Sequence, residues 1–196
     1  VIIPAPYWVS FAGITEVAGG TPVFLTSGFA AGLKLSPARL EAAITPRSRW
    51  VIINSPSNPA GMGYSPDEIR AVADVIRRHP RLMVISDDLY EHLTFDGFTF
   101  STIAGIAPDL ADRVLTLHGV SKSYCMTGWR IGYAAAPVPL VKAMAKLQSQ
   151  STSSPGSIAQ YAAVAALNGP TDFIAENNAA FARRRTLVID ALNAME

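Results

Sequence analysis

A series of short apolar runs, separated by helical patterns, constrains the fold more than any other feature of the sequence. Most of these runs are rich in Val and Ile and do not alternate with polar residues, which is typical of strands buried on both faces. The runs are Val1–Ile3, Pro22–Leu25, Trp50–Ile53, Leu82–Ile85, Val114–Leu117 and Ile131–Ala135. Strands that alternate with helices predict an α/β fold, in which a mostly parallel sheet is sandwiched by helices.

Capping signals mark where two helices begin. Ser65 precedes a pattern over residues 66–79 in which acids come early and bases late, and Ser36 precedes a shorter helix that ends near Ile44. Serine accepts hydrogen bonds from the first free backbone N–H groups of a helix, and such charges complement the helix dipole. After Ala136 only helical patterns follow, at about 139–148, 157–167 and from residue 172 onward.

This change of pattern predicts the domain organisation. We expect a partial large domain over residues 1–170 and, over residues 171–196, a long helix that leads toward a second, truncated domain. The chain has no initiator Met, starts inside a predicted strand and stops inside a predicted helix. We therefore expect a fragment of a longer protein.

Composition narrows the class of function. Sixteen basic and fifteen acidic residues give a net charge of +1, which favours neither a nucleic-acid nor a membrane-surface partner. The apolar runs are far shorter than the roughly 18 residues of a bilayer span, and no signal peptide is visible. Cys125 is the single cysteine, and no Cys/His cluster has metal-ligand spacing. We expect a cytoplasmic protein without a metal site.

Polar clusters follow three of the apolar runs. They lie at residues 54–61, 86–90 and 121–132, and in the third Lys122 precedes Arg130 by eight positions. Chemistry in open α/β sheets takes place beyond the carboxyl ends of the strands. An amine and a guanidinium in one such cluster suit an aldehyde and its phosphate.

Pyridoxal phosphate has both groups, and the other clusters contain partners for the rest of it. Lys122 can form the Schiff base with the aldehyde, because burial and a neighbouring cation lower the pKa of a lysine amine. Asp87 can keep the pyridine nitrogen protonated, which makes the ring an electron sink. Arg130 can bind the phosphate through two parallel charge-assisted hydrogen bonds.

Three further side chains suit the ring and its phenolic oxygen. Asn58 and Tyr90 can donate to that oxygen, and Trp8 can stack on the ring, a contact worth roughly 0.5–1.5 kcal/mol beyond area burial. Taken singly, each of these side chains is more often part of a turn, a cap, the core or the surface. Their joint presence, in this order and next to predicted strand ends, favours a cofactor site.

These motifs resemble the large domain of a fold-type I, pyridoxal-phosphate-dependent aminotransferase of class I. Within that class the chain is most similar to the aspartate aminotransferase group and its bacterial-type branch. The resemblance covers most of the chain and is carried by Pro6–Ser10, Asn58–Gly61, Ser86–Tyr90, Ser121–Lys122, Thr127–Tyr133 and Gln150–Pro155.

The resemblance implies a role for each candidate residue. Lys122 would be both the Schiff-base lysine and the general base, and the others would bind the cofactor: Trp8, Asn58, Asp87, Tyr90, Ser121 and Arg130. The family often has a phosphate-binding Ser where this chain has Gly119, which leaves Ser121 as the nearby hydroxyl. The resemblance also implies a homodimer with active sites at the subunit interface and the loop 151–155 near the partner's site.

The expected function is therefore transamination between an amino acid and a 2-oxo acid. Two alternatives remain open. One is a pyridoxal-phosphate-dependent carbon–sulfur β-lyase, which uses the same electron sink for elimination. The other is an aminotransferase-like effector domain of a transcriptional regulator. The sequence does not decide which amino acid is the substrate.

Overall fold

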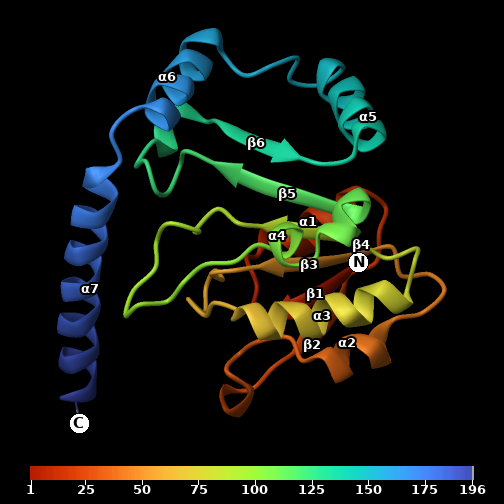
Figure 1. The fold of residues 1–196 in the computed structure, drawn as a ribbon, viewed down its shortest axis with the longest axis horizontal. Coiled ribbons are helices and arrows are strands. Elements are labelled where there is room, and N and C mark those ends of the chain that lie inside the picture. The colour runs from red at the N-terminus through yellow and green to blue at the C-terminus, as the bar shows by residue number, and fades with distance from the viewer. Residues whose placement is uncertain (196) are drawn as a thin grey trace.

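A six-stranded sheet in the order β2-β1-β3-β4-β5-β6 forms the centre of the computed structural model, which describes residues 1–195 (Figure 1). The strands are β1 (Ile2–Ala5), β2 (Val23–Thr26), β3 (Trp50–Asn54), β4 (Met83–Asp87), β5 (Val114–Gly119) and β6 (Gly132–Ala135). Neighbours among β1 to β5 pair in parallel, whereas β6 runs antiparallel to β5. The predicted α/β fold with a mostly parallel sheet is confirmed.

Helices connect the strands and then form the last part of the chain. They are α1 (Ser10–Val17), α2 (Pro37–Ala43), α3 (Pro66–Arg78), α4 (Ile103–Ile106), α5 (Val138–Ser149), α6 (Ser157–Asn168) and α7 (Asp172–Asn193), with short 3-10 helices η1 (Phe29–Ala31), η2 (Pro108–Arg113) and η3 (Thr127–Trp129). The predicted start of α3 is confirmed. The Glu68 N–H donates to Ser65 Oγ at 3.3 Å and the Ser65 N–H to Glu68 Oε2 at 2.8 Å, a reciprocal capping box.

Buried side chains lie on both faces of the sheet. Helices α2, α3 and α4 cover one face, where the core contains alternate residues of the central strands, such as Val51 and Ile53 on β3. On the other face Phe11 of α1 packs against Ile3 and Ile52. Successive side chains of a strand point to opposite faces, so a continuous apolar run supplies both layers.

The prediction that the apolar runs are buried was wrong for the two edge strands. Every residue of β6 is exposed, and so is most of β2. Each of these strands has a hydrogen-bonded neighbour on one side only. Helix α1 was not predicted from the sequence, because its start has no side-chain cap hydrogen bond.

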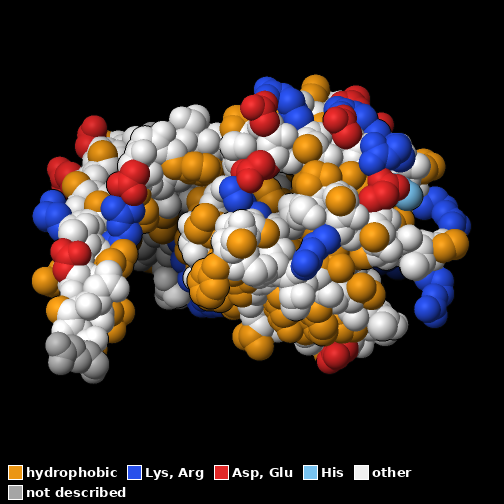
Figure 2. All heavy atoms as spheres, turned by 90° about the horizontal axis from the view of Figure 1, so that it is seen from below, with side chains coloured by type: hydrophobic (Ala, Val, Ile, Leu, Met, Phe, Trp, Pro, Cys, Tyr) orange, Lys and Arg blue, Asp and Glu red, His pale blue; other side chains and the backbone are white. Residues whose placement is uncertain are grey.

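Helix α7 stands beside the sheet, next to the loops that follow β4 (Figure 1). Asn178 Nδ2 donates to the backbone oxygen of His92 at 2.6 Å, and Arg185 pairs with both oxygens of Asp96 at 2.6 and 3.0 Å. Hydrophobic side chains nevertheless remain exposed along α7, at the left of Figure 2. The predicted division near residue 170 stays a prediction, and Glu196 lies outside the described residues. Within residues 1–195, no helix is both long and apolar enough to cross a membrane.

Candidate functional site

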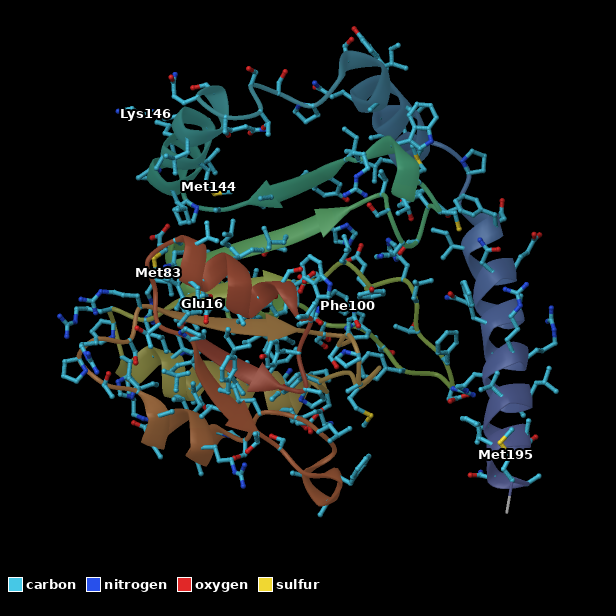
Figure 3. The ribbon with its side chains drawn as sticks, turned by 180° about the vertical axis from the view of Figure 1, so that it is seen from behind. Glu16, Met83, Phe100, Met144, Lys146 and Met195 are labelled. Carbon is cyan, nitrogen blue, oxygen red and sulfur yellow. The ribbon has the colours of Figure 1, made fainter. Side chains whose placement is uncertain are left out.

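The carboxyl ends of the parallel strands all lie at the end of the sheet that faces α7, which we call the carboxyl edge. In Figure 3, Met83 marks the amino end of β4, on the side away from α7. The loops that follow β3, β4 and β5 therefore begin at one common edge, because these strands pair in parallel. This edge is where ligands bind in open α/β sheets.

A cleft of about 200 Å³ opens at this edge. All seven candidate residues from the sequence lie together in its lining, which consists of Trp8, Asn54, Asn58, Asp87, Leu89, Tyr90, Ser121, Lys122, Thr127 and Arg130. The lining also contains Asn54, Leu89 and Thr127, which were not predicted as site residues. Asn54 could have been found, because it is the polar residue that directly ends an apolar strand run.

Hydrogen bonds join the loop after β3 to the end of β4. Asn54 Nδ2 donates to the backbone oxygen of Asp87 at 3.0 Å, and the Asn58 N–H donates to Asn54 Oδ1 at 2.8 Å. Asn58 Nδ2 lies 3.5 Å from Tyr90 Oη. The amide of Asn58 and the phenol of Tyr90 therefore lie side by side in the cleft, close enough to donate to one acceptor.

Asp87 carries the carboxylate of the cleft. The Leu89 N–H donates to Asp87 Oδ1 at 3.3 Å. Burial raises the pKa of Asp87, and the neighbouring Asp88 raises it further, while the Leu89 hydrogen bond and the positive charges of His118 and Lys122 oppose the rise. A cation that binds opposite Asp87 would favour its ionised form.

The adjacent Asp88 has a different environment. Its side chain is buried, and Ser86 Oγ donates to Asp88 Oδ1 at 2.7 Å. Burial raises the pKa of Asp88 as well. Asp88 is absent from the lining of the cleft, so only Asp87 of this pair presents its carboxylate there.

The two cations of the cleft come from the segment between β5 and β6. Lys122 Nζ lies 5.9 Å from the ring centroid of Tyr90. Arg130 ends η3 in the left-handed conformation, with φ of 55°, and its Nη1 donates to the backbone oxygen of Thr127 at 3.0 Å. Within residues 1–195, neither cation forms an ion pair with a carboxylate. Both are therefore available to an anionic or carbonyl ligand.

Trp8 borders the same cleft from the loop after β1. Its ring meets Phe11 edge-on, with centroids 5.5 Å apart and planes at 89°. The side chain is 43% exposed, so a large part of the indole is free to stack on a planar ligand.

Packing explains why this chain has glycine at position 119. A Cβ atom there would lie 3.0 Å from the backbone oxygen of Ile131 and 3.3 Å from Gly132 Cα. Gly119 and Gly132 are direct partners in the β5–β6 register. A serine at this position would therefore crowd the neighbouring strand.

The side chains of the cleft fit pyridoxal phosphate. One carboxylate, one amine and one guanidinium match a pyridine nitrogen, an aldehyde and a phosphate, and the adjacent amide and phenol match a phenolic oxygen. No cluster of three or more potential metal-ligating side chains is present among residues 1–195.

Comparisons with known proteins agree with this geometry. The family model "Aminotransferase class I and II" matches residues 1–196. The chain is 60% identical over 193 residues to an aspartate/prephenate aminotransferase of Cereibacter sphaeroides, covering 98% of this chain and 48% of that protein. It is 52% identical over 196 residues to an aspartate aminotransferase of Rhizobium meliloti, covering 100% of this chain and 48% of that protein.

Solved structures give the same result. The crystal structure of a Rhizobium meliloti aspartate aminotransferase matches with a TM-score of 0.98 at 52% identity, over 100% of this chain and 49% of that one. A Thermus thermophilus aspartate aminotransferase with maleate matches with a TM-score of 0.91 at 39% identity, over 98% and 50% of the two chains. The chain thus spans about half the length of these relatives. It belongs to the class I and II aminotransferase family, whose class I members use pyridoxal 5′-phosphate.

Proposed function

We propose that the protein containing this chain is a pyridoxal-phosphate-dependent aminotransferase, which moves an amino group between an amino acid and a 2-oxo acid. The main support for this proposal is that one cleft contains Lys122, Asp87 and Arg130. Because its relatives are named aspartate or aspartate/prephenate aminotransferases, we propose a dicarboxylic amino acid as one substrate.

Each polar group of the cleft has a proposed task. When bound, pyridoxal phosphate supplies an electron sink that acidifies the α-hydrogen of the amino acid. Lys122 Nζ would hold the cofactor at its aldehyde carbon, and the same amine would take the proton from the substrate α-carbon. Asp87 holds a proton on the pyridine nitrogen through an ionic hydrogen bond, which offsets the cost of its burial.

The remaining side chains hold the cofactor in place. Asn58 and Tyr90 donate to the phenolic oxygen, a role supported by their side chains lying 3.5 Å apart in the cleft. Arg130 and Ser121 bind the phosphate, and Trp8 covers one face of the ring. A fixed ring plane keeps the α-hydrogen within reach of Lys122, and such orientation lowers the barrier of a bimolecular step.

We also propose that the protein is a cytoplasmic homodimer. Helix α6 supports the dimer, because Ile158 and Tyr161 are 77% and 78% exposed on it. Large exposed apolar patches are typical of interaction surfaces. The cytoplasmic location rests on the sequence, whose single cysteine cannot form an internal disulfide.

Lys122→Ala in the full-length protein tests the proposed function. We expect turnover to fall by at least about a thousandfold, because a positioned base alone contributes about 10²–10⁴. Borohydride reduction should attach the cofactor mass to the Lys122 peptide of the wild type and leave it absent from the variant. Lys146→Ala is the matched control, since Lys146 projects from α5 far from the sheet edge that faces α7 (Figure 3).

The outcome also separates the alternatives. Oxo-acid-dependent amine transfer by the wild type supports transamination, whereas release of pyruvate and ammonia from a cysteine conjugate would indicate a β-lyase. Retention of normal turnover by the Lys122 variant would contradict both.

A further inference from the structure

We infer that Asn54 is a positioning residue that fixes Asp87 and Asn58 relative to each other, so that both meet the cofactor in one geometry. This inference rests on the proposed function. Asn54 occupies the last position of β3, directly opposite Asp87 in the β3–β4 register. It lines the cleft next to both residues.

The amide of Asn54 uses its donor and its acceptor on two different chain segments. Its Nδ2 donates to the backbone oxygen of Asp87 at 3.0 Å, and its Oδ1 accepts from the N–H of Asn58 at 2.8 Å. Only one orientation of the amide satisfies both contacts, because the oxygen of Asp87 cannot donate and the N–H of Asn58 cannot accept. A planar group with one donor and one acceptor side is therefore required here.

These contacts extend the link between β3 and β4 beyond the last backbone pair. The Ser55 N–H also donates to the Asp87 oxygen, at 3.3 Å, so that two donors from the β3 side hold this one carbonyl. The carboxylate of Asp87 is held separately, by the Leu89 N–H at 3.3 Å. The backbone and the side chain of Asp87 are thus both fixed.

Three hydrogen bonds connect Asp87, Asn54, Asn58 and Tyr90 in series, and all four residues line the cleft. Asp87 is bonded to Asn54, Asn54 to Asn58, and Asn58 to Tyr90, which follows Asp87 by three residues in the chain. This series joins three of the proposed cofactor contacts, Asp87, Asn58 and Tyr90. Groups held in this way lose little freedom on binding, which favours affinity and correct orientation.

Two substitutions in the full-length protein separate the hydrogen bond to Asp87 from the hydrogen bond to Asn58. Asn54→Ala removes the donor and the acceptor. Asn54→Asp keeps an acceptor for the Asn58 N–H, loses the donor to the Asp87 oxygen and adds a negative charge near Asp87. Asn168→Ala is the matched control, because Asn168 also donates to a backbone oxygen, that of Val164 on α6, but away from the cleft.

The first readout is hydrogen exchange in the apoprotein, which is independent of activity. We expect peptides that contain the Asn58 N–H to exchange about tenfold faster in Asn54→Ala and to stay protected in Asn54→Asp and in Asn168→Ala, since a hydrogen bond is worth about 1 kcal/mol. Unchanged exchange in Asn54→Ala would overturn the inference.

The second readout is a pH titration of the visible absorbance of the bound cofactor. A pyridinium charge and donors to the phenolic oxygen both favour the deprotonated chromophore. Asp87 should be misplaced in both Asn54 variants, and Asn58 in Asn54→Ala alone, so the apparent pKa of the chromophore should rise in both, by about one unit in Asn54→Ala. A purely structural role would lower thermal stability and leave this pKa unchanged, and that result would also overturn the inference. Absence of a cofactor absorbance from the wild type would instead contradict the proposed function.

Discussion

Burial of the Asp87 carboxyl favours its neutral form, whereas its proposed role requires the ionised form. Burial raises its pKa above the ordinary value of 3.8, so that above this pH the folded apoprotein holds a proton that the unfolded chain has lost. The free energy of unfolding then decreases as the pH rises through the window above 3.8. The negative charge needed at the cofactor nitrogen is therefore unfavourable before the cofactor binds.

Asp87→Asn should consequently move stability and function in opposite directions. We expect the apoprotein variant to be more stable than the wild type in urea at pH 7, with a difference that shrinks as the pH falls and the wild-type carboxyl takes up its proton. Cofactor affinity should fall by about 10–100-fold, the worth of one charged hydrogen bond. Asp112→Asn, on the exposed surface of η2, should change neither quantity. A variant apoprotein less stable than the wild type at pH 7 would contradict this account.

At the scale of elements, the close pairing of β5 and β6 predicts the effect of introducing a serine at position 119. Gly119→Ser should destabilise the protein by about 1–3 kcal/mol, because its Cβ would meet backbone atoms of Ile131 and Gly132 that cannot rotate away. Urea unfolding measures the loss. Gly13→Ala on α1 is the control, since a Cβ there meets nothing within 4 Å. A serine variant as stable as the wild type would contradict this prediction and show that β6 can shift to accommodate the Cβ.

Many of the helices and strands could be predicted from the sequence, because the residue patterns that specify them are local. The capping box at Ser65 and the apolar run of β3 follow from residues close together in the chain. The exposure of β6 could not, since it depends on which strands end at the sheet edges. For the same reason, the sequence could predict which polar side chains line the cleft but could not predict the hydrogen bonds between them. The bond from Asn54 to Asp87 depends on the β3–β4 register, which no single segment specifies.

For the whole molecule, the exposed face of α6 predicts how copies associate. A stable dimer buries roughly 800 Å² per partner, with apolar side chains at its centre. We expect the full-length protein to be a dimer in light scattering, and Tyr161→Glu to shift it toward monomer by at least about tenfold in dissociation constant. Arg70→Glu places the same charge on the exposed side of α3 and should leave the dimer intact. A dimer unaffected by the Tyr161 variant would exclude this face.

The antiparallel pairing of β5 and β6 has a consequence for how related sequences can differ. Gly119 faces Gly132 and His118 faces Tyr133 in this register, and the segment between them carries Lys122 and Arg130. If an insertion or deletion shifted the β5–β6 register by one residue, every side chain of β6 would turn to the opposite side of the sheet. An insertion or deletion between Lys122 and Arg130 would also change the spacing of the amine and the guanidinium. We therefore expect related proteins to vary here by substitution and to keep the length of the segment.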